Sequence, residues 1–172
     1  TLTQACLQFL ELDDVEIIEL RPEVPRLAMQ YLGLADDPRL TVRIGDALEL
    51  LDSAETADLI FVDLYTDTGP APGHLAWKFL ENCQKRLSPG GWLVINQWGT
   101  DDGRPLGAAL LRGLYHRHYW EIPVKEGNVI LLVPADLDQP LDIAALTARA
   151  EALKPRLGYS LQSLLDVLRP AT

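Results

Sequence analysis

The stretch ADLIFVDLYTDTGP, residues 57–70, decides the fold of this chain. Its apolar run, Leu59 to Val62, is long enough for one buried strand and too short for a helix. Asp63 ends the run, and a polar turn that closes on Gly69-Pro70 follows it. Ligands bind just beyond the carboxyl ends of the strands in an open parallel sheet. The sequence therefore predicts that Asp63 points into a ligand site.

Strand and helix patterns alternate on both sides of this stretch. Strands are expected at 15–20, 40–44, 59–62, 92–96, 119–124 and 129–133, and helices at 1–10, 22–32, 47–51, 72–87, 105–116, 143–154 and 160–168. This alternation predicts an α/β fold with a doubly wound, Rossmann-like, mostly parallel sheet. The last two strands form a hairpin, which is expected to add one antiparallel strand at an edge. We expect residues 88–91 to end the preceding helix before the strand at 92–96, and Pro155 and Gly158 to separate the last two helices.

The beginning of the pattern differs from a complete fold of this kind. In such folds the first strand is central and leads through a Gly-rich turn into the first helix. Here the pattern opens directly on a helix, at residues 1–10. Because a sheet without its central strand leaves two edges unpaired, we expect that strand and the Gly-rich loop to lie outside these 172 residues. The predicted organisation is a nucleotide-binding domain, truncated at its N-terminus, over 1–135 and a helical extension packed on it over 136–172.

Composition limits the classes of partner. The net charge of −10 argues against a nucleic-acid partner, and the sequence has no apolar run near the roughly 20 residues of a membrane span. Cys6 and Cys83 lie far apart in helix-like patterns, so we expect buried free thiols and a cytoplasmic protein. The histidines and cysteines lack metal-ligand spacing, and we expect no metal.

Two acidic residues end the strands that precede Asp63. Glu19 is placed to accept hydrogen bonds from ribose hydroxyls; the alternative is a favourable charge ahead of the helix that begins near Pro22. Asp46 is placed to accept the exocyclic amine of adenine while the Ala47 N–H meets a ring nitrogen. The alternative for Asp46 is a helix N-cap, and its two interpretations are compatible.

The residues around Asp63 suggest the second half of a site. The Asp63 carboxylate is suited to orienting or deprotonating an amine nucleophile, or else it caps a loop. Tyr65 and Asp67 follow in the loop and are candidate substrate contacts, although ordinary loop chemistry explains both equally well. Gln97 ends a later strand and is expected to line the pocket.

Four stretches together resemble the spermidine synthase (polyamine aminopropyltransferase) family, within the class I S-adenosylmethionine-dependent transferase fold. They are VEIIELRPEV, DDPRLTVRIGDALELL, ADLIFVDLYTDTGP and FLENCQKRLSPGGWLVIN, and they cover about residues 15–96. The resemblance implies that S-adenosylmethionine or its decarboxylated form binds as co-substrate. Glu19 would hold the ribose, and Asp46 and Ala47 would hold the adenine. Leu20, Leu64 and the catalytic Asp63 would also contact the co-substrate.

In that chemistry, decarboxylated S-adenosylmethionine gives its aminopropyl group to putrescine and leaves methylthioadenosine. The chain departs from the family pattern at Thr66, where a second Asp is usual, and at Val124, where a substrate-binding Tyr is expected. The leading hypothesis is a spermidine synthase-like transferase that acts on a small amine. The alternatives are a methyltransferase for another small molecule and a non-catalytic homologue used for binding or assembly. Apolar helices beyond Ile143 suit a homodimer contact or core packing equally well.

Overall fold

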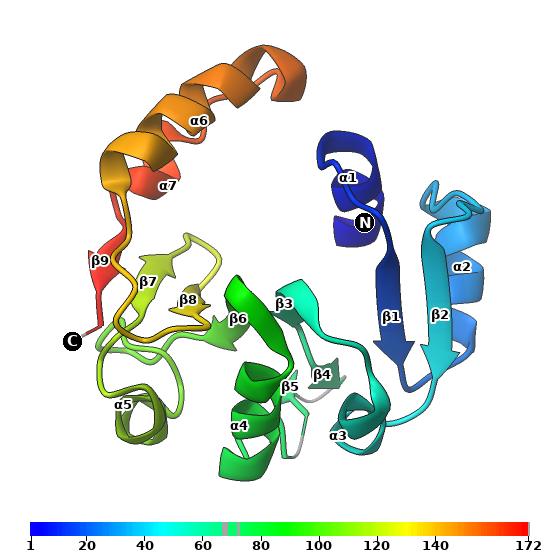
Figure 1. Cartoon of the computed structure of the whole chain (residues 1–172), viewed down its shortest axis with the longest axis horizontal. Helices are drawn as coiled ribbons and strands as arrows, with labels where there is room; N and C mark the ends of the chain where they lie inside the picture. The colour runs from blue at the N-terminus through cyan, green and yellow to red at the C-terminus, as the bar shows by residue number, and fades with distance from the viewer. Residues whose placement is uncertain (67–68, 72, 172) are drawn as a thin grey trace. The chain divides into compact units, whose positions relative to one another are not determined.

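The computed structural model describes residues 1–66, 69–71 and 73–171. The chain forms two compact units, Thr1–Ala54 and Glu55–Thr172 (Figure 1).

The first unit is a pair of parallel strands with helices. Its elements are α1 (Leu2–Phe9), β1 (Val15–Glu19), α2 (Glu23–Tyr31), β2 (Leu40–Ile44), α3 (Ala47–Leu50) and the 3-10 helix η1 (Leu51–Ser53). Glu19 lies opposite Ile44, so β1 and β2 end at the same edge. Arg39 joins the start of β2 to α1, because its guanidinium contacts the Asp37 carboxylate at 2.8 Å and donates to the Leu7 carbonyl at 3.2 Å. These elements lie where the sequence predicts them.

The second unit contains residues 57–70, the stretch ADLIFVDLYTDTGP. Its elements are β3 (Ala57–Val62), β4 (Tyr65–Thr66), β5 (Gly69–Pro70), α4 (Trp77–Lys85), β6 (Leu87–Trp98), α5 (Ala108–Tyr115), β7 (Trp120–Pro123), β8 (Asn128–Pro134), α6 (Ile143–Leu157), α7 (Gln162–Leu165) and β9 (Arg169–Pro170). The main sheet has the strand order β3-β6-β8-β7-β9, and β4 pairs with β5 separately.

The strand directions confirm the predicted mixed α/β sheet and correct one detail. β3 is parallel to β6, β8 is antiparallel to β6, and β7 is antiparallel to β8. β3, β6 and β7 therefore run one way, and β8 runs the other way. The prediction that the antiparallel strand of the hairpin lies at an edge is wrong, because β8 pairs on both sides and lies between β6 and β7. The two-residue strand β9 pairs with β7 and was not predicted.

Two predicted breaks lie inside regular elements. Residues 88–91 belong to β6, where the register with β3 shifts between Ala57 and Leu59, so they form a bulge within the strand. A Cβ on Gly91 would lie 2.9 Å from the Asp58 carbonyl oxygen, and this close approach requires glycine. Pro155 lies inside α6, which continues to Leu157 and ends at Gly158 with a φ of +78°.

The core of the second unit lies between the sheet and the helices α4 and α5. Alternate residues of β6 are buried, as expected for a strand with one face on the core. Fully buried apolar side chains come from four elements: Leu80, Cys83, Leu93, Ile95, Leu111, Leu131 and Val133. Cys6 and Cys83 are both buried free thiols, which confirms the prediction.

Cys83 makes the stability of the fold sensitive to alkaline pH. Burial raises the pKa of its thiol from 9.0 to about 12. The unfolded chain releases this proton near pH 9, whereas the folded chain keeps it until about pH 12. We therefore expect the Cys83 contribution to the unfolding free energy to be complete below pH 9 and to fall as pH rises from 9 toward 12. Urea unfolding between pH 8 and pH 10.5 measures this slope. It should be shallower in Cys83→Ala, and an equal slope in both proteins would contradict the assignment.

The C-terminal helices expose much of their surface. Ala150 is a buried residue of α6, whereas Ile143 is 47% exposed, Leu164 39% and Val167 43%. In the described part of the chain, every helix is too short or too polar to cross a membrane. The homodimer contact expected for these helices stays a prediction.

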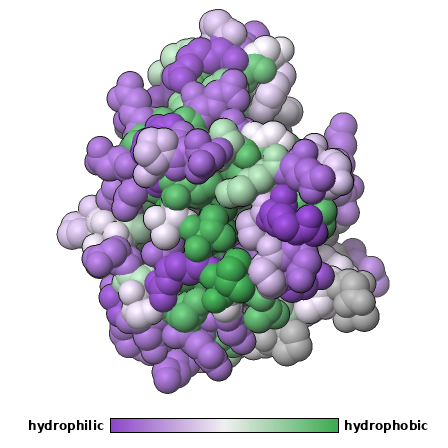
Figure 2. All heavy atoms as spheres, turned by 90° about the vertical axis from the view of Figure 1, so that its right-hand side faces the viewer, coloured by the Kyte–Doolittle hydropathy of each residue, from purple (hydrophilic) through white to green (hydrophobic). Residues whose placement is uncertain are grey.

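Each unit also has open strand edges. Among the described residues, β1 and β2 pair only with each other, and β3 pairs only with β6. Leu59 and Phe61 of β3 are 38% and 41% exposed, and Ile44 of β2 is 48% exposed. Figure 2 shows apolar side chains, in green, among hydrophilic ones on one face of the molecule. The expectation that a first strand lies outside this sequence stays a prediction.

Candidate functional site

Asp63 lies directly after β3, where its exposed carboxylate faces a second polar side chain. Val62 pairs with Ile95 across the parallel strands β3 and β6, and both are buried. The next residues, Asp63 and Asn96, therefore share the opposite face of the sheet. Asn96 Nδ2 donates a hydrogen bond of 2.9 Å to Asp63 Oδ1. The sequence interpretation missed Asn96, although Asn96 follows the apolar residues WLVI just as Asp63 follows LIFV.

Asn128 extends this contact onto a third strand. Trp98 and Asn128 lie opposite each other on β6 and β8, so Asn96 and Asn128 are diagonal neighbours on one face. Asn128 Nδ2 donates to Asn96 Oδ1 at 2.7 Å. Three polar side chains from β8, β6 and the end of β3 thus form one line across the edge of the sheet.

An aromatic pair lies beside this line. Tyr65 and Trp98 stack with ring centroids 6.1 Å apart and an interplanar angle of 30°, and Trp98 is 44% exposed. The Tyr65 hydroxyl donates to the Asn96 carbonyl at 3.1 Å. Partial burial, and then the nearby Asp63 charge, raise the pKa of Tyr65, so this hydroxyl keeps its proton at neutral pH. A Cβ on Gly69 would lie 3.2 Å from the Trp98 ring, so glycine lets β5 approach the ring closely.

Gln97 points to the opposite face of β6 and is fully buried. Its Oε1 accepts from the Trp98 N–H at 3.0 Å, and its Nε2 lies 3.1 Å from His74 Nε2. His74 Nδ1 lies 2.7 Å from the Ala71 carbonyl, so Nδ1 carries the proton and Nε2 accepts from Gln97. Gln97 thereby ties the segment before α4 to β6. Its predicted substrate contact stays a prediction.

The loop after Asp63 is closed by backbone and hydroxyl contacts. The Leu64 carbonyl accepts from the Ala71 N–H at 2.9 Å. The Thr66 hydroxyl donates to the Gly69 carbonyl at 3.0 Å. Asp67, predicted as a substrate contact, lies outside the described residues.

In the first unit, Glu19 and Asp46 are neighbours because the Gly45 N–H donates to the Glu19 carbonyl at 2.9 Å. Glu19 Oε1 accepts from the Arg21 N–H at 2.9 Å. Asp46 Oδ1 accepts from the Leu48 N–H at 2.9 Å, which confirms the N-cap interpretation. In the described part of the chain, the second carboxylate oxygen of each acid and the Ala47 N–H have no protein partner. Leu20, beside Glu19, is 64% exposed.

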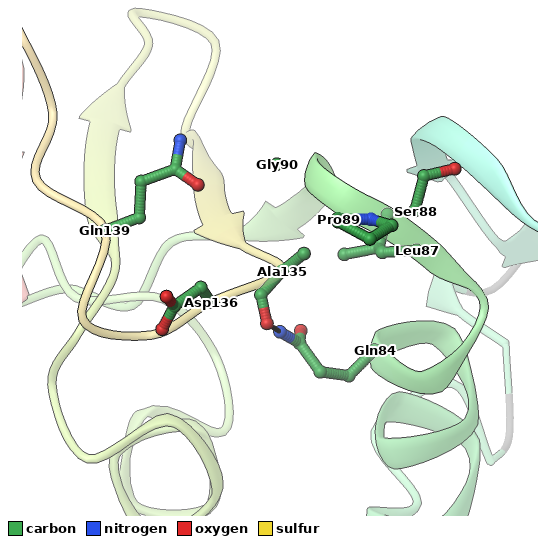
Figure 3. A pocket seen from close by; sticks show the side chains of 8 residues that line it. All are labelled: Gln84, Leu87, Ser88, Pro89, Gly90, Ala135, Asp136 and Gln139. Carbon is green, nitrogen blue, oxygen red and sulfur yellow. Dashed lines mark hydrogen bonds between the residues drawn. The ribbon is translucent and has the colours of Figure 1, made fainter.

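A hollow of about 350 Å³ lies elsewhere in the second unit (Figure 3). Gln84, Ser88, Asp136 and Gln139 contribute its polar lining, and the Gln84 amide donates to the Ala135 carbonyl at 2.9 Å. This hollow adjoins the start of β6, whereas Asn96 lies near the end of that strand. Within the described ranges, no group of three or more His, Cys, Asp or Glu residues is placed to hold a metal ion.

The mixed sheet and its helices have a class I S-adenosylmethionine-dependent transferase fold. The structure resembles human Methyltransferase-like protein 13 in complex with SAH, with a TM-score of 0.70, 26% identity, and coverage of 84% of this chain and 71% of that one. It also resembles a spermidine synthase in complex with the transition-state analogue AdoDATO, with a TM-score of 0.72 and 17% identity over 95% and 60% of the two chains. The second likeness bears on the fold alone.

The sequence comparison is more specific. The Spermine/spermidine synthase domain matches residues 5–100, and the chain belongs to this family. A polyamine aminopropyltransferase from Clostridium acetobutylicum is 35% identical over 98 residues, which are 53% of this chain and 34% of that protein. A probable spermidine synthase from Corynebacterium glutamicum is 25% identical, with a TM-score of 0.61 over 78% and 53% of the two chains. The chain spans about a third of the length of the curated relatives it matches.

Proposed function

We propose that this protein transfers an aminopropyl group from decarboxylated S-adenosylmethionine to a small amine such as putrescine. The observation that carries the proposal is the exposed Asp63 carboxylate after β3, oriented by Asn96, in a chain of the Spermine/spermidine synthase domain family. A cytoplasmic location is part of the proposal.

The acids of the first unit fit the nucleoside part of such a donor. Among the described residues, one carboxylate oxygen of Glu19 has no protein partner, which leaves it available to ribose hydroxyls. Within the same described ranges, one oxygen of Asp46 and the Ala47 N–H beside it also have no protein partner, and this N–H can donate to a ring nitrogen. The set offers two acceptors and one donor, which suits a ribose and an adenine edge.

In this reaction the protein does not need to form a covalent bond to either substrate. The amine nitrogen attacks the aminopropyl carbon beside the sulfonium, the carbon–sulfur bond breaks, and its electron pair stays on the sulfur of methylthioadenosine. The attacking amine must lose one proton, and the sulfonium is already a good leaving group. Asp63 would position the amine and accept that proton, so the main contributions are orientation and general base catalysis.

The nucleoside assignment predicts a specific loss of affinity in Glu19→Ala. Hydrogen bonds to a charged group are each worth about 1.5–3 kcal/mol, so we expect methylthioadenosine to bind about 10- to 100-fold more weakly. Calorimetry with methylthioadenosine, S-adenosylmethionine and its decarboxylated form measures this. Glu49→Gln, on the exposed side of α3, is the matched control and should bind as the unmodified protein does. Absence of binding of all three compounds to the unmodified protein would refute the adenosyl-donor proposal.

Methyl transfer is the second candidate function. The likeness to Methyltransferase-like protein 13 in complex with SAH, over 84% of this chain, favours it. The two functions differ in their products: methyl transfer leaves S-adenosylhomocysteine, and aminopropyl transfer leaves methylthioadenosine. Binding without turnover of either donor would favour a non-catalytic homologue.

A further inference from the structure

We infer that Asn96 and Asn128 are positioning residues, which form a hydrogen-bond relay that fixes the Asp63 carboxylate toward the amine substrate. The relay runs from Asn128 Nδ2 to Asn96 Oδ1 at 2.7 Å and from Asn96 Nδ2 to Asp63 Oδ1 at 2.9 Å. Its role in catalysis rests on the proposed function, because that function makes Asp63 the group that meets the amine.

The relay determines which way the Asn96 amide faces. A carboxylate only accepts hydrogen bonds, so the Asn96 NH2 group must face Asp63. Asn128 reinforces this orientation because its own NH2 group donates to the Asn96 oxygen. With Asn96 reversed, its oxygen would face the carboxylate and its NH2 group would face another NH2 group. Asp63 and Asn128 therefore both disfavour the reversed orientation of the Asn96 amide.

The relay also gives the two Asp63 carboxylate oxygens different roles. Oδ1 is occupied by Asn96, whereas Oδ2 accepts no hydrogen bond from another residue in the described ranges. One oxygen is thus anchored to the sheet, and the other is left for a substrate. The anchor matters because Asp63 is exposed and lies beyond the last paired residue of β3. Without it, the carboxylate would rotate among several orientations, only some of which suit an amine.

Kinetics with decarboxylated S-adenosylmethionine and putrescine test the inference. Asn96→Ala should lower kcat about 10- to 100-fold because the base is no longer held in place, with little change in the KM for the nucleoside donor. Asn128→Ala should lower kcat only about 3- to 10-fold, because it removes one neutral hydrogen bond. Asn96→Asp, which places a like charge against Asp63, should be at least as impaired as Asn96→Ala. Gln139→Ala, an amide change in the distant hollow, is the matched control and should keep full activity.

A variant cycle separates positioning from a general loss of structure. In an Asp63→Asn background, Asn96→Ala should have little further effect on kcat, because the relay acts through the Asp63 carboxylate. Equal fractional losses in both backgrounds, or full activity in Asn96→Ala, would overturn the inference while leaving the proposed function intact.

Side-chain amide NMR signals test the relay without any turnover. The Asn96 NH2 signals should shift on Asp63→Ala and on Asn128→Ala and should be unmoved in Gln139→Ala. If the unmodified protein is inactive with every donor and amine, the proposed function fails, and these signals alone decide the relay. Asn96 signals that are indifferent to Asp63→Ala would overturn it.

Discussion

Replacing Asp63 with asparagine is expected to lower kcat for aminopropyl transfer about 1,000-fold, within the range for loss of a general base. Asparagine has nearly the same shape as aspartate, and its oxygen can still accept from Asn96 Nδ2. The fold should therefore persist, while the negative charge and the proton-accepting oxygen are lost. Because we propose that Glu19 and Asp46 contact the nucleoside, methylthioadenosine affinity should stay within a few-fold of the unmodified value.

The control for this prediction is Asp58→Asn, an exposed carboxylate near the start of the same strand. It should retain normal turnover. Steady-state kinetics and calorimetry on the three proteins make the comparison. A fully active Asp63→Asn protein would show that Asp63 is not the catalytic group, and parallel losses of turnover and nucleoside affinity would show that its role is structural.

Replacing Arg169 with alanine is expected to lower the unfolding free energy by about 2–3 kcal/mol. Glu121 is 1% exposed, and Arg169 contacts its Oε2 through Nε at 3.1 Å and Nη2 at 3.0 Å. Arg169 also donates to the Gly103 carbonyl at 2.6 Å. Without the guanidinium, the Glu121 carboxylate stays buried and unpaired. Since Arg169 is itself 38% exposed, solvent reduces the cost below that of a fully buried pair.

Urea unfolding of Arg169→Ala, and of the double variant with Glu121→Leu, distinguishes charge burial from lost packing. The double variant should recover much of the stability, because an apolar side chain at position 121 needs no partner. β9 should also pair less well with β7, since Arg169 lies opposite Glu121 in that ladder. An Arg169→Ala protein as stable as the unmodified one would contradict the assigned role of the ion pair.

Local patterns predicted the local features of this molecule. An Asp before a short helix predicted the Asp46 cap, and the apolar run Leu59 to Val62, followed by Asp63, predicted β3. Alternation within WLVINQW also carried a signal that was not used, because it places Gln97 on the face of Leu93 and Ile95 and Asn96 on the other face.

The features that were missed depend on pairing between distant segments. The Asp63–Asn96–Asn128 line depends on the register of β3 with β6 and of β6 with β8. The sequence pattern of a single strand does not determine its register with another strand. The place of β8 between β6 and β7 likewise depends on which edge the hairpin joins. A two-residue strand such as β9 has no periodicity to detect, and its contact with β7 includes the pairing of Arg169 with Glu121, which is distant in sequence.

Product analysis of the unmodified protein tests the central claim most directly. The purified protein is incubated with decarboxylated S-adenosylmethionine and putrescine, and the products are measured by mass spectrometry. The proposed function predicts methylthioadenosine and spermidine in equal amounts, formed with Asp63→Asn at about a thousandth of the unmodified rate. Formation of neither product by a protein that binds the donor would contradict it.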